Sequence, residues 1–509
     1  MNKKNTELLW ETFPNLYRGR NLSLVQSLIP FGFECGDGWF SIIWDLSEKL
    51  EKLILDLPEN EREHYCASQV KEKFGCYDKQ TEALTKSGWK FFKNINKDDE
   101  IAVLNGEHLE YHHPSDIISY HYRGKMYRLK TRGVDLLVTP NHNLYVAKGT
   151  YYNGKYSPPK KVEYPMEFTT PGKYFGKNKR FIKTAIWGGE HADFFVLPEW
   201  SYKSNFGFDA PRQGIFGEME RQYVHEKVQV PMGDWLEFLG FYVAEGCSDA
   251  SSGTVAIASN NVDGGIEKEY TKNLIDNIGF KYSITMKDRS AAVFRIYKKQ
   301  LALWLIEHCG HLAQNKKAPP FIKELSPDLI NRFLIGLYRG DGHKTKTAHI
   351  LTTVSKQLAD DVQELILKTG DTSYCFVLPP TRGTFVGGRE IIGRFDIHCV
   401  NWLKKSRSHN TANKGMAKKS VEELVDYDGD VFCVTVPHNI IYVRRNGIPV
   451  WCGNSLRFYM HASTDEMETL ISEAETKTET TCESCGSPGS LRGKGWLSIR
   501  CDKCWKKPK

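Results

Sequence analysis

A chain of 509 residues is too long for one ordinary domain, so we expect several hydrophobic cores. The formal net charge of +7 is compatible with nucleic-acid binding and equally with a mixed, solvated surface. No apolar signal core follows the N-terminus and no apolar run is long enough to cross a bilayer, so we expect a cytoplasmic chain without membrane contact. The thirteen cysteines are expected to act as nucleophiles or metal ligands rather than as a disulfide framework.

The first predicted helix lies near the N-terminus. Apolar residues recur at helical spacing from Trp39 to Leu57, and Pro58 ends the run. A second helix is predicted near the C-terminus, where Ser463-Thr464-Asp465-Glu466 resembles a capping box before Met467, Leu470, Ile471 and Ala474. Residues 1–75 and 455–509 therefore read as the two halves of one small α/β host domain. Joined end to end, residues 71–75 and 455–460 read as one continuous strand.

The segment between these halves, residues 76–454, carries reactive side chains at both ends. Cys76 offers a thiol, which is a strong nucleophile once ionised, and Gly75 leaves the preceding carbonyl unhindered. At the other end, Asn454 can cyclise through its side-chain amide and break the peptide bond that follows it. Ser455, the next residue, offers a hydroxyl as a second nucleophile.

Three stretches of this segment resemble the motifs of an intein, a protein-splicing element of the Hint family. They are Cys76-Tyr77-Asp78-Lys79-Gln80-Thr81 running on to Ser87-Gly88-Trp89, then Thr139-Pro140-Asn141-His142, and finally His438-Asn439-Ile440-Ile441-Tyr442 with Trp451-Cys452-Gly453-Asn454-Ser455. The resemblance implies an all-β horseshoe built from residues 76–230 and 416–454. Alternating stretches at 125–130 and 134–138 fit strands of such a fold.

The resemblance also implies a reaction that needs no cofactor. Cys76 attacks the carbonyl before it, Ser455 takes over the acyl group, and Asn454 cyclises, so that Gly75 becomes ligated to Ser455. One position departs from the family, because the residue before Asn454 is commonly His and is Gly453 here.

Four further residues match positions to which the intein family assigns assisting roles. Thr139 and His142 would help the first step, by stabilising the oxyanion and donating a proton to the scissile nitrogen. Cys433 and His438 would help the later transesterification and cyclisation. Read singly, a cysteine is usually a buried small hydrophobe, and a histidine is more often structural than catalytic.

Residues 231–415 contain an internal repeat, in which residues 238–246 match residues 334–342. A β-rich stretch follows each copy, at 255–260 and at 349–355, and a helix ending at glycine follows that. Small residues recur one helical turn apart in both copies, at Gly240 and Ala244 and at Gly336 and Gly340. We therefore expect two copies of one α+β unit around a pseudo-twofold axis, with their leading helices closely packed.

Each leading helix ends at a carboxylate, Glu245 in the first copy and Asp341 in the second. The helix dipole disfavours a negative charge there, and a shared divalent cation would explain the placement. Glu245 and Asp341 are therefore candidate ligands of Mg²⁺, which prefers oxygen ligands. The alternative is a pair of ordinary helix ends with solvated acids.

The repeat resembles the LAGLIDADG (DOD-type) homing endonucleases, a frequent insertion within inteins. The resemblance implies a monomeric, Mg²⁺-dependent enzyme that cuts double-stranded DNA at the intein-less target site. Lys316 or Lys317 matches a catalytic lysine of the family, with a solvated lysine pair as the alternative. DNA would lie across the two β-surfaces, with lysines and arginines reaching phosphates.

The C-terminal half of the host domain has four cysteines spaced C-x2-C-x15-C-x2-C, namely Cys482, Cys485, Cys501 and Cys504. This spacing predicts a zinc ribbon over residues 482–504, with Zn²⁺ in a structural site that has no open position. Two disulfides are the alternative, and a reducing cytoplasm disfavours them. Basic residues near the ribbon fit a nucleic-acid contact or a solvated tail. The host halves resemble small phage-type zinc-ribbon proteins, whose role is unknown.

These observations predict a multidomain precursor with the boundaries 1–75, 76–230, 231–415, 416–454 and 455–509. Its middle excises itself and carries a DNA endonuclease. The main alternative is a zinc-ribbon DNA-binding protein whose insertion does not splice. A Hint module that only cleaves, and a stand-alone nuclease with accessory domains, are further alternatives.

Overall fold

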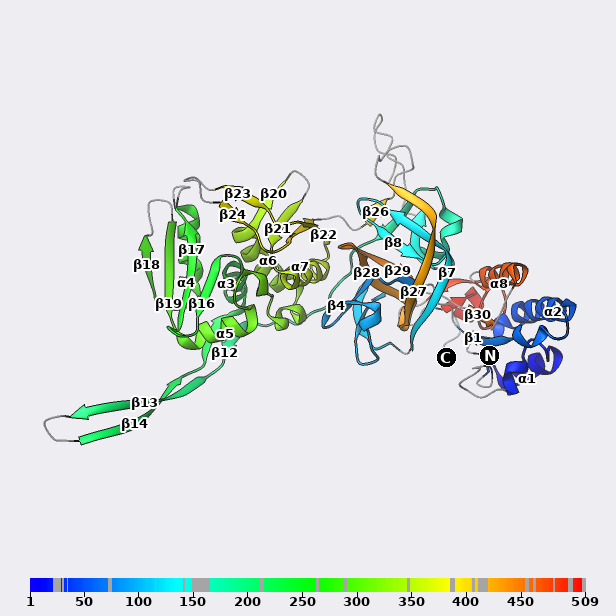
Figure 1. Cartoon of the computed structure of the whole chain (residues 1–509), viewed down its shortest axis with the longest axis horizontal. Coiled ribbons are helices and arrows are strands. Elements are labelled where there is room, and N and C mark those ends of the chain that lie inside the picture. The colour runs from blue at the N-terminus through cyan, green and yellow to red at the C-terminus, as the bar shows by residue number, and fades with distance from the viewer. Residues whose placement is uncertain are drawn as a thin grey trace, which may run out of the picture. The chain divides into compact units, whose positions relative to one another are not determined.

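A computed structural model describes residues 1–21, 29, 32–33, 35–71, 76–114, 116–140, 142–148, 165–210, 215–261, 265–286, 291–345, 348–384, 390–404, 408–410, 420–453, 457–460, 464–478, 481–492 and 498–505. The chain divides into two compact units (Figure 1). One comprises Met1–Lys183 with Ser408–Lys509, and the other is Thr184–Arg407. Within the described residues, no helix is both long and apolar enough to cross a membrane.

The two ends of the chain share one hydrophobic core. Helix α2 (Phe40–Asp56) covers the predicted apolar run, and its buried face carries Ile43, Leu46, Leu50 and Ile54. Helix α8 (Asp465–Thr478) adds Met467, Ile471 and Ala474 to the same core. The Thr464 hydroxyl accepts a hydrogen bond from the backbone N–H of Met467 at 3.3 Å and so caps α8. Both predicted helices are confirmed, and the two halves fold together.

The junction of the two halves is a pair of strands rather than one strand. Strand β1 (Ala67–Lys71) pairs antiparallel with β30 (Arg457–Met460), and Lys71 lies opposite Arg457. The predicted continuous strand across this junction is therefore wrong. Residues 76–453 instead enter the host domain between two paired strands, at the place where a hairpin tip would stand.

Residues 76–183 and 408–453 form an all-β part of the first unit, without an α-helix among their described residues. Four strands make a closed barrel: β2 (Tyr77–Asp78), β27 (Val421–Thr435), β7 (Asp116–Lys130) and β8 (Asp135–Val138). A six-stranded sheet joins β29 (Ile448–Gly453), β28 (Ile440–Arg445), β3 (Glu82–Thr85), β5 (Ile101–Asn105) and β6 (His108–His112), with β4 (Gly88–Phe91) paired to β3. A third sheet has the order β10 (Glu167–Thr169), β9 (Leu144–Lys148), β11 (Lys179–Ile182) and β26 (Ser408–Asn410).

The early and late strands of this all-β part are interleaved and joined by buried ion pairs. Arg444 on β28 makes two hydrogen bonds to the Glu82 carboxylate of β3, at 2.7 and 3.0 Å. Its neighbour Arg445 contacts Asp78 at 3.1 Å and Asp135 at 3.2 Å. Removing one partner of such a buried pair leaves an uncompensated charge, so these contacts fix the register of β28 between strands from the start of the segment.

The second unit, Thr184–Arg407, contains both copies of the predicted repeat. The first sheet has the order β16 (Gly246–Asp249), β17 (Thr254–Asn260), β19 (Ala291–Tyr297), β18 (Tyr282–Met286). The second has the same order in β20 (Gly342–Lys344), β21 (His349–Thr353), β25 (Ile397–Leu403), β22 (Thr372–Leu378). A leading helix precedes each sheet, α3 (Met232–Glu245) or α6 (Pro327–Asp341). A following helix lies after the second strand of each copy, α4 (Ile266–Ile278) or α7 (Lys356–Lys368), and α5 (Lys299–Cys309) follows the first sheet.

The leading helices pack at their small residues, as the sequence predicts. A Cβ atom added at Gly240 of α3 would lie 2.0 Å from the carbonyl oxygen of Phe333. One added at Gly336 of α6 would lie 2.1 Å from the carbonyl oxygen of Glu237. Such separations exclude any side chain, so the backbones of α3 and α6 touch at these glycines.

This unit is larger than the predicted 231–415 at its start and ends earlier. Strands β12 (Phe194–Leu197) and β15 (Val228–Pro231) pair with each other, and Leu197 and Val230 are fully buried in the core that contains α3. Between them, β13 (Trp200–Ala210) and β14 (Ile215–His225) form a long two-stranded ribbon (Figure 1). Short β-strands continue the β-rich pattern that precedes them, so this boundary is not readable from the residue pattern.

Candidate functional sites

The first residue of the proposed splicing segment lies in a closed environment. Cys76 is fully buried before β2, where Tyr77 pairs with Val138 of β8 and with Phe432 of β27. The Cys76 backbone N–H donates to the Thr139 hydroxyl oxygen at 3.1 Å, and the Thr139 N–H donates to the Cys76 carbonyl at 3.0 Å. The Thr139 hydroxyl therefore sits at the nitrogen of the bond that Cys76 would have to break.

The last described residues of the segment reach the same turn. The Gly453 N–H donates to the carbonyl of Asn143 at 3.1 Å, and the His142 N–H donates to the carbonyl of Thr139 at 2.9 Å. One turn, residues 139–143, thus contacts Cys76 at one end of the segment and Gly453 at the other. The predicted residues Asn454 and Ser455, and Gly75 before Cys76, lie outside the described residues.

His142 is fully buried between the two ends. Its Nε2 lies 3.2 Å from the Cys452 sulfur, and its ring packs edge-on against Tyr77 with the ring centres 4.5 Å apart. Burial raises the pKa of the Cys452 thiol to about 12, so this cysteine stays protonated near neutral pH. Cys452 had no predicted role, because its place beside His142 comes from strand pairing alone.

Cys433 of β27 belongs to the same small cluster as Cys76. Phe432 is the strand partner of Tyr77, which sets Cys433 beside Cys76, and both pack with Met126 and Val431. The Tyr120 hydroxyl adds a polar contact, 3.6 Å from the Cys76 sulfur. The structure therefore brings Cys76, Thr139, His142 and Cys433 together, although their positions span the whole segment.

His438 lies beyond Cys433, in the short turn η9 (Pro437–Asn439), and has an unusual backbone. Its φ is 65°, a left-handed value that is uncommon for a residue with a side chain and often marks a functional constraint. The turn leads into β28, whose first residue Ile440 pairs with Gly453. Burial lowers the pKa of His438 more than nearby Glu110 raises it, so the imidazole is neutral near pH 7.

The glycine at the penultimate position has a steric explanation. A Cβ atom at Gly453 would lie 2.4 Å from the Phe168 ring and 3.0 Å from the Asn143 carbonyl oxygen. Phe168 of β10 therefore occupies the space that a side chain at position 453 would need. A histidine could not stand there without displacing this ring.

The second candidate site lies between the two repeats of the Thr184–Arg407 unit. Glu245 at the end of α3, Asp341 at the end of α6 and Lys316 line one cleft of about 470 Å³. Burial, with Glu245 nearby, raises the pKa of Asp341 to about 7, and burial raises the pKa of Glu245 with help from Glu267. Asp341 is nevertheless exposed by surface area, so solvent screens part of this repulsion.

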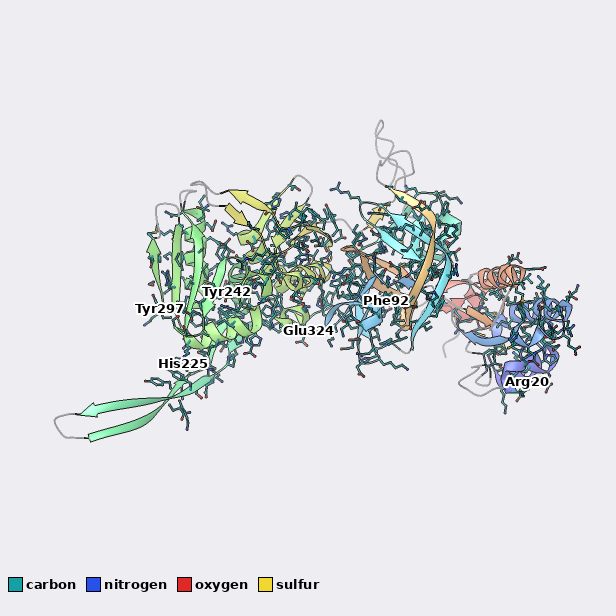
Figure 2. All side chains as sticks on the ribbon, in the orientation of Figure 1. Arg20, Phe92, His225, Tyr242, Tyr297 and Glu324 are labelled. Atoms are coloured by element: carbon teal, nitrogen blue, oxygen red, sulfur yellow. The ribbon has the colours of Figure 1, made fainter. Side chains whose placement is uncertain are left out.

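Lys316 is buried against the end of the first helix. Its ammonium donates to the Gly246 carbonyl at 2.8 Å and lies 4.2 Å from the centre of the Tyr242 ring, which Figure 2 labels. It thus compensates the negative end of the α3 dipole and partly offsets the raised pKa of Asp341. Of the predicted pair, Lys316 is the lysine that lines the cleft.

The four predicted zinc ligands are gathered in one place. Their sulfur atoms, from Cys482, Cys485, Cys501 and Cys504, all lie within 4.8 Å of one another. The knuckle packs on the N-terminal half of the host domain, because the Gly38 N–H donates to the Glu483 carbonyl at 2.8 Å. The Trp39 indole N–H donates to the Thr481 carbonyl at 2.9 Å. The thiol cluster therefore packs against the residues that lead into the N-terminal end of α2.

A family model described as a LAGLIDADG-like domain matches residues 328–398. The chain contains a LAGLIDADG-like domain. The match covers α6, which ends at Asp341, and the β-strands that follow it as far as the start of β25. The first copy, α3 to β19, repeats the same strand order.

Curated relatives match a larger part of the chain. The chain is 29% identical over 436 residues to "DNA-directed RNA polymerase subunit beta C-terminal section" of Stigeoclonium helveticum, covering 76% of this chain and 37% of that protein. It is 30% identical over 494 residues to "ATP-dependent Clp protease proteolytic subunit" of Chlamydomonas moewusii, covering 75% and 45%. It is 25% identical over 334 residues to "ATP-dependent DNA helicase Hel308" of Thermococcus kodakarensis, covering 58% and 28%. The chain spans less than half the length of each of these relatives.

Among solved structures, mesophilic variants of the homing endonuclease I-DmoI align with 35% of this chain and 91% of their own, at 18% identity and a TM-score of 0.24. A class 3 split intein variant aligns with 30% of this chain and 81% of its own, at 16% identity and a TM-score of 0.17.

Proposed function

We propose that residues 76–454 form a self-splicing intein that interrupts a small host protein. The observation that carries the proposal is the turn at residues 139–143, which contacts both Cys76 and Gly453. Splicing requires the two ends of the excised segment to lie side by side. The pairing of β1 with β30 supports the same conclusion from outside the segment, because it holds the flanking strands together.

The names of the relatives support an element that moves between hosts. A polymerase subunit, a protease subunit and a helicase have unrelated activities, yet each shares a long stretch with this chain. A shared host activity cannot explain one sequence in three such proteins. An inserted element, with its own LAGLIDADG-like domain, can.

The proposed reaction begins at Cys76. Its sulfur attacks the Gly75 carbonyl, a C–S bond forms, and the C–N bond to Cys76 breaks after a proton reaches that nitrogen. The Thr139 oxygen is within hydrogen-bond distance of this nitrogen, so it orients the scissile bond. His142, beside Cys452 and one turn from Thr139, would supply the proton.

The proposed reaction ends at Asn454. The Ser455 hydroxyl attacks the thioester and receives the acyl group, and Cys76 leaves as a thiol. The Asn454 side-chain nitrogen then attacks its own carbonyl, which closes a succinimide and releases the segment. His438, neutral and two residues before the strand partner of Gly453, would accept and return a proton, since position 453 has no room for an imidazole. A final O-to-N acyl shift restores an amide between Gly75 and Ser455.

Intact-mass spectrometry tests the splicing proposal. By length, the 58.3 kDa chain should give products of about 15 and 43 kDa, and the smaller one should contain a Gly75–Ser455 peptide. The Cys76→Ala/Asn454→Ala double variant should remain full length. Cys66→Ser, which changes a buried host cysteine, is the matched control and should splice. A wild-type chain that stays intact would favour the alternative, a zinc-ribbon protein with an insertion that does not splice.

We further propose that the LAGLIDADG-like unit is an endonuclease that cuts double-stranded DNA at the uninterrupted host gene. Glu245 and Asp341 fit a divalent cation, because two oxygen ligands of raised pKa share one cleft and a cation would relieve their repulsion. Bound Mg²⁺ would polarise the phosphodiester and activate water. Lys316, fixed by the end of α3 in the same cleft, would add positive charge beside the phosphate.

A plasmid with the rejoined host sequence tests this second activity. Cleavage should require Mg²⁺, stop with EDTA and disappear in Asp341→Asn, while splicing of that variant continues. Glu267→Gln is a matched control, because it changes a carboxylate near Glu245 that does not line the cleft. Cleavage by Asp341→Asn at the wild-type rate would exclude the proposed ligand set.

For the host domain, we propose a structural Zn²⁺ held by Cys482, Cys485, Cys501 and Cys504. Four thiols within 4.8 Å of one another fit a tetrahedral S₄ site with no open position. Cys482→Ser should lose this zinc and lower the melting temperature of the host domain. An unchanged metal content by mass spectrometry would contradict the assignment. The domain is a candidate for nucleic-acid binding, which a gel-shift assay with the spliced product would test.

A further inference from the structure

A second group of metal-ligand side chains lies in the all-β part, at the proposed splicing centre. Glu110 and His112 are two residues apart on β6, so their side chains emerge on the same face of the strand. His438 approaches them from the turn η9, which contacts the neighbouring strand β5. One ligand atom from each of the three lies within 4.8 Å of the others.

The distances suit a small transition-metal ion. The His112 Nε2 is 2.8 Å from Glu110 Oε2, and the His438 Nε2 is 4.0 Å from the same oxygen. Ligand atoms about 2 Å from a tetrahedral zinc ion lie about 3.3 Å apart, a value between these two distances. Small rotations of the side chains would therefore close the site around the ion.

The surroundings of the three residues are those of an open metal site. His438 is 7% exposed, whereas His112 and Glu110 are 34% and 36% exposed, so an ion can enter from the solvent side. The Asn105 amide donates to the other Glu110 oxygen at 2.8 Å and so orients the carboxylate. Within the described part of the chain, the buried Nδ1 of His438 has no hydrogen-bond partner.

We propose that Glu110, His112 and His438 form a binding site for Zn²⁺ that controls splicing. Two imidazoles and one carboxylate suit zinc and related borderline metals, and they do not suit Mg²⁺, which prefers oxygen ligands. The bound ion would leave a position for water. It would also bind the His438 imidazole, which we assign to the last steps of splicing. His438 cannot bind the ion and transfer a proton at the same time. The control function rests on the proposed splicing activity, whereas the metal site rests on geometry alone.

Metal content tests the site without any splicing. With excess Mg²⁺ to occupy the Glu245–Asp341 cleft, the full-length Cys76→Ala/Asn454→Ala chain should bind two zinc ions, one for each ligand cluster, by calorimetry or metal analysis. Adding His112→Gln should leave one ion, bound at the cysteine site. Adding Cys482→Ser should leave one ion, bound at the histidine site. His108→Gln, on the same strand but outside the cluster, is the matched control and should keep both ions. A single ion in the full-length chain that disappears with Cys482→Ser would overturn the site.

Splicing kinetics test the control function. At free zinc about 100 times the Kd, about 1 molecule in 100 keeps a free His438, so splicing should slow about 100-fold and recover with EDTA. His112→Gln should splice in metal-free buffer and resist zinc, whereas His108→Gln should remain sensitive. Equal inhibition of His112→Gln would place the effect at another residue, such as Cys76, and overturn the control function. Failure of every variant to splice in metal-free buffer would instead refute the proposed splicing activity and leave the zinc titration as the test of the site.

Discussion

The all-β part and the Thr184–Arg407 unit both assemble a candidate site from distant residues, but they use different elements. In the all-β part, Cys76, Thr139, Cys433 and Cys452 meet because strands from the start and the end of the segment pair. In the other unit, Glu245 and Asp341 meet because two matching helices pack at their glycines and end together. One site therefore depends on long-range strand register, and the other on a local motif used twice.

This difference explains what the family comparison found. A local motif is recognisable within one copy, so the family model matches residues 328–398 and with them Asp341. The residues around Cys76 are separated by most of the segment, and short stretches hold few of them. Because the two sites are assembled by different elements, a substitution that abolishes splicing should leave DNA cleavage unchanged, and the reverse. The following experiments test this independence.

The largest expected effect is the loss of splicing in Cys76→Ala. Without its nucleophile, the first step should slow by roughly 10³-fold or more, so no ligated product should appear on a gel. DNA cleavage by the other unit should continue at the wild-type rate. A parallel loss of DNA cleavage would show that the two units do not act separately.

A smaller effect is expected for Thr139→Val, which keeps the shape of the side chain and removes its hydroxyl. The Cys76 N–H would lose its acceptor, and removing one such preorganised contact typically slows a reaction about 10²- to 10³-fold. Thr139→Ser keeps the hydroxyl and should retain most of the rate. Thioester formation is measured by cleavage with an added thiol, and equal rates for Val and Ser would remove Thr139 from the mechanism.

The stability of the all-β part should respond to a buried lysine. Burial lowers the pKa of Lys183 from 10.5 to about 7, so the unfolded chain binds more protons than the folded chain between these values. Stability should therefore rise with pH from about 7 towards 10, and Lys183→Met should stabilise by on the order of 2–4 kcal/mol near pH 7. The gain should shrink as the pH approaches 10.

A second buried lysine provides the control for this prediction. Lys179 is paired with Glu422 at 2.6 Å, so Lys179→Met should destabilise by removing the cation that balances this partly buried carboxylate. Thermal unfolding of the Cys76→Ala/Asn454→Ala chain measures both variants. Equal effects of the two substitutions would mean that burial, rather than pairing, decides the outcome.

The smallest effect is expected at the helix pair of the other unit. Gly240→Ala forces α3 away from Phe333 and should destabilise this unit by about 1–3 kcal/mol, with slower DNA cleavage and unchanged splicing. Gly233→Ala, at the start of the same helix, meets only Arg332 atoms at 3.5 Å and beyond, and should be neutral or slightly stabilising. Equal melting temperatures of the two variants would contradict the close packing of α3 and α6.

Much of the fold follows from short-range pattern. The apolar spacing of residues 39–57 predicts α2, and the repeated glycines predict the contact of α3 and α6. Both depend on neighbouring residues, so they are readable locally. The boundary near Thr184 was not readable, because β12 and β15 look like further strands of the preceding β-rich stretch until Leu197 and Val230 are seen in the core of the other unit.

By itself, the sequence determined which residues are chemically able to act: a cysteine and an asparagine at the segment ends, two helix-ending carboxylates and four paired cysteines. Tertiary structure alone decided which of them meet, and which unpredicted residues join them. Strand pairing set Cys452 against His142, Phe168 against Gly453, and Glu110 with His112 against His438. The physical reason is that reactivity belongs to a side chain, whereas proximity is set by hydrogen-bond register and core packing between strands far apart in the chain.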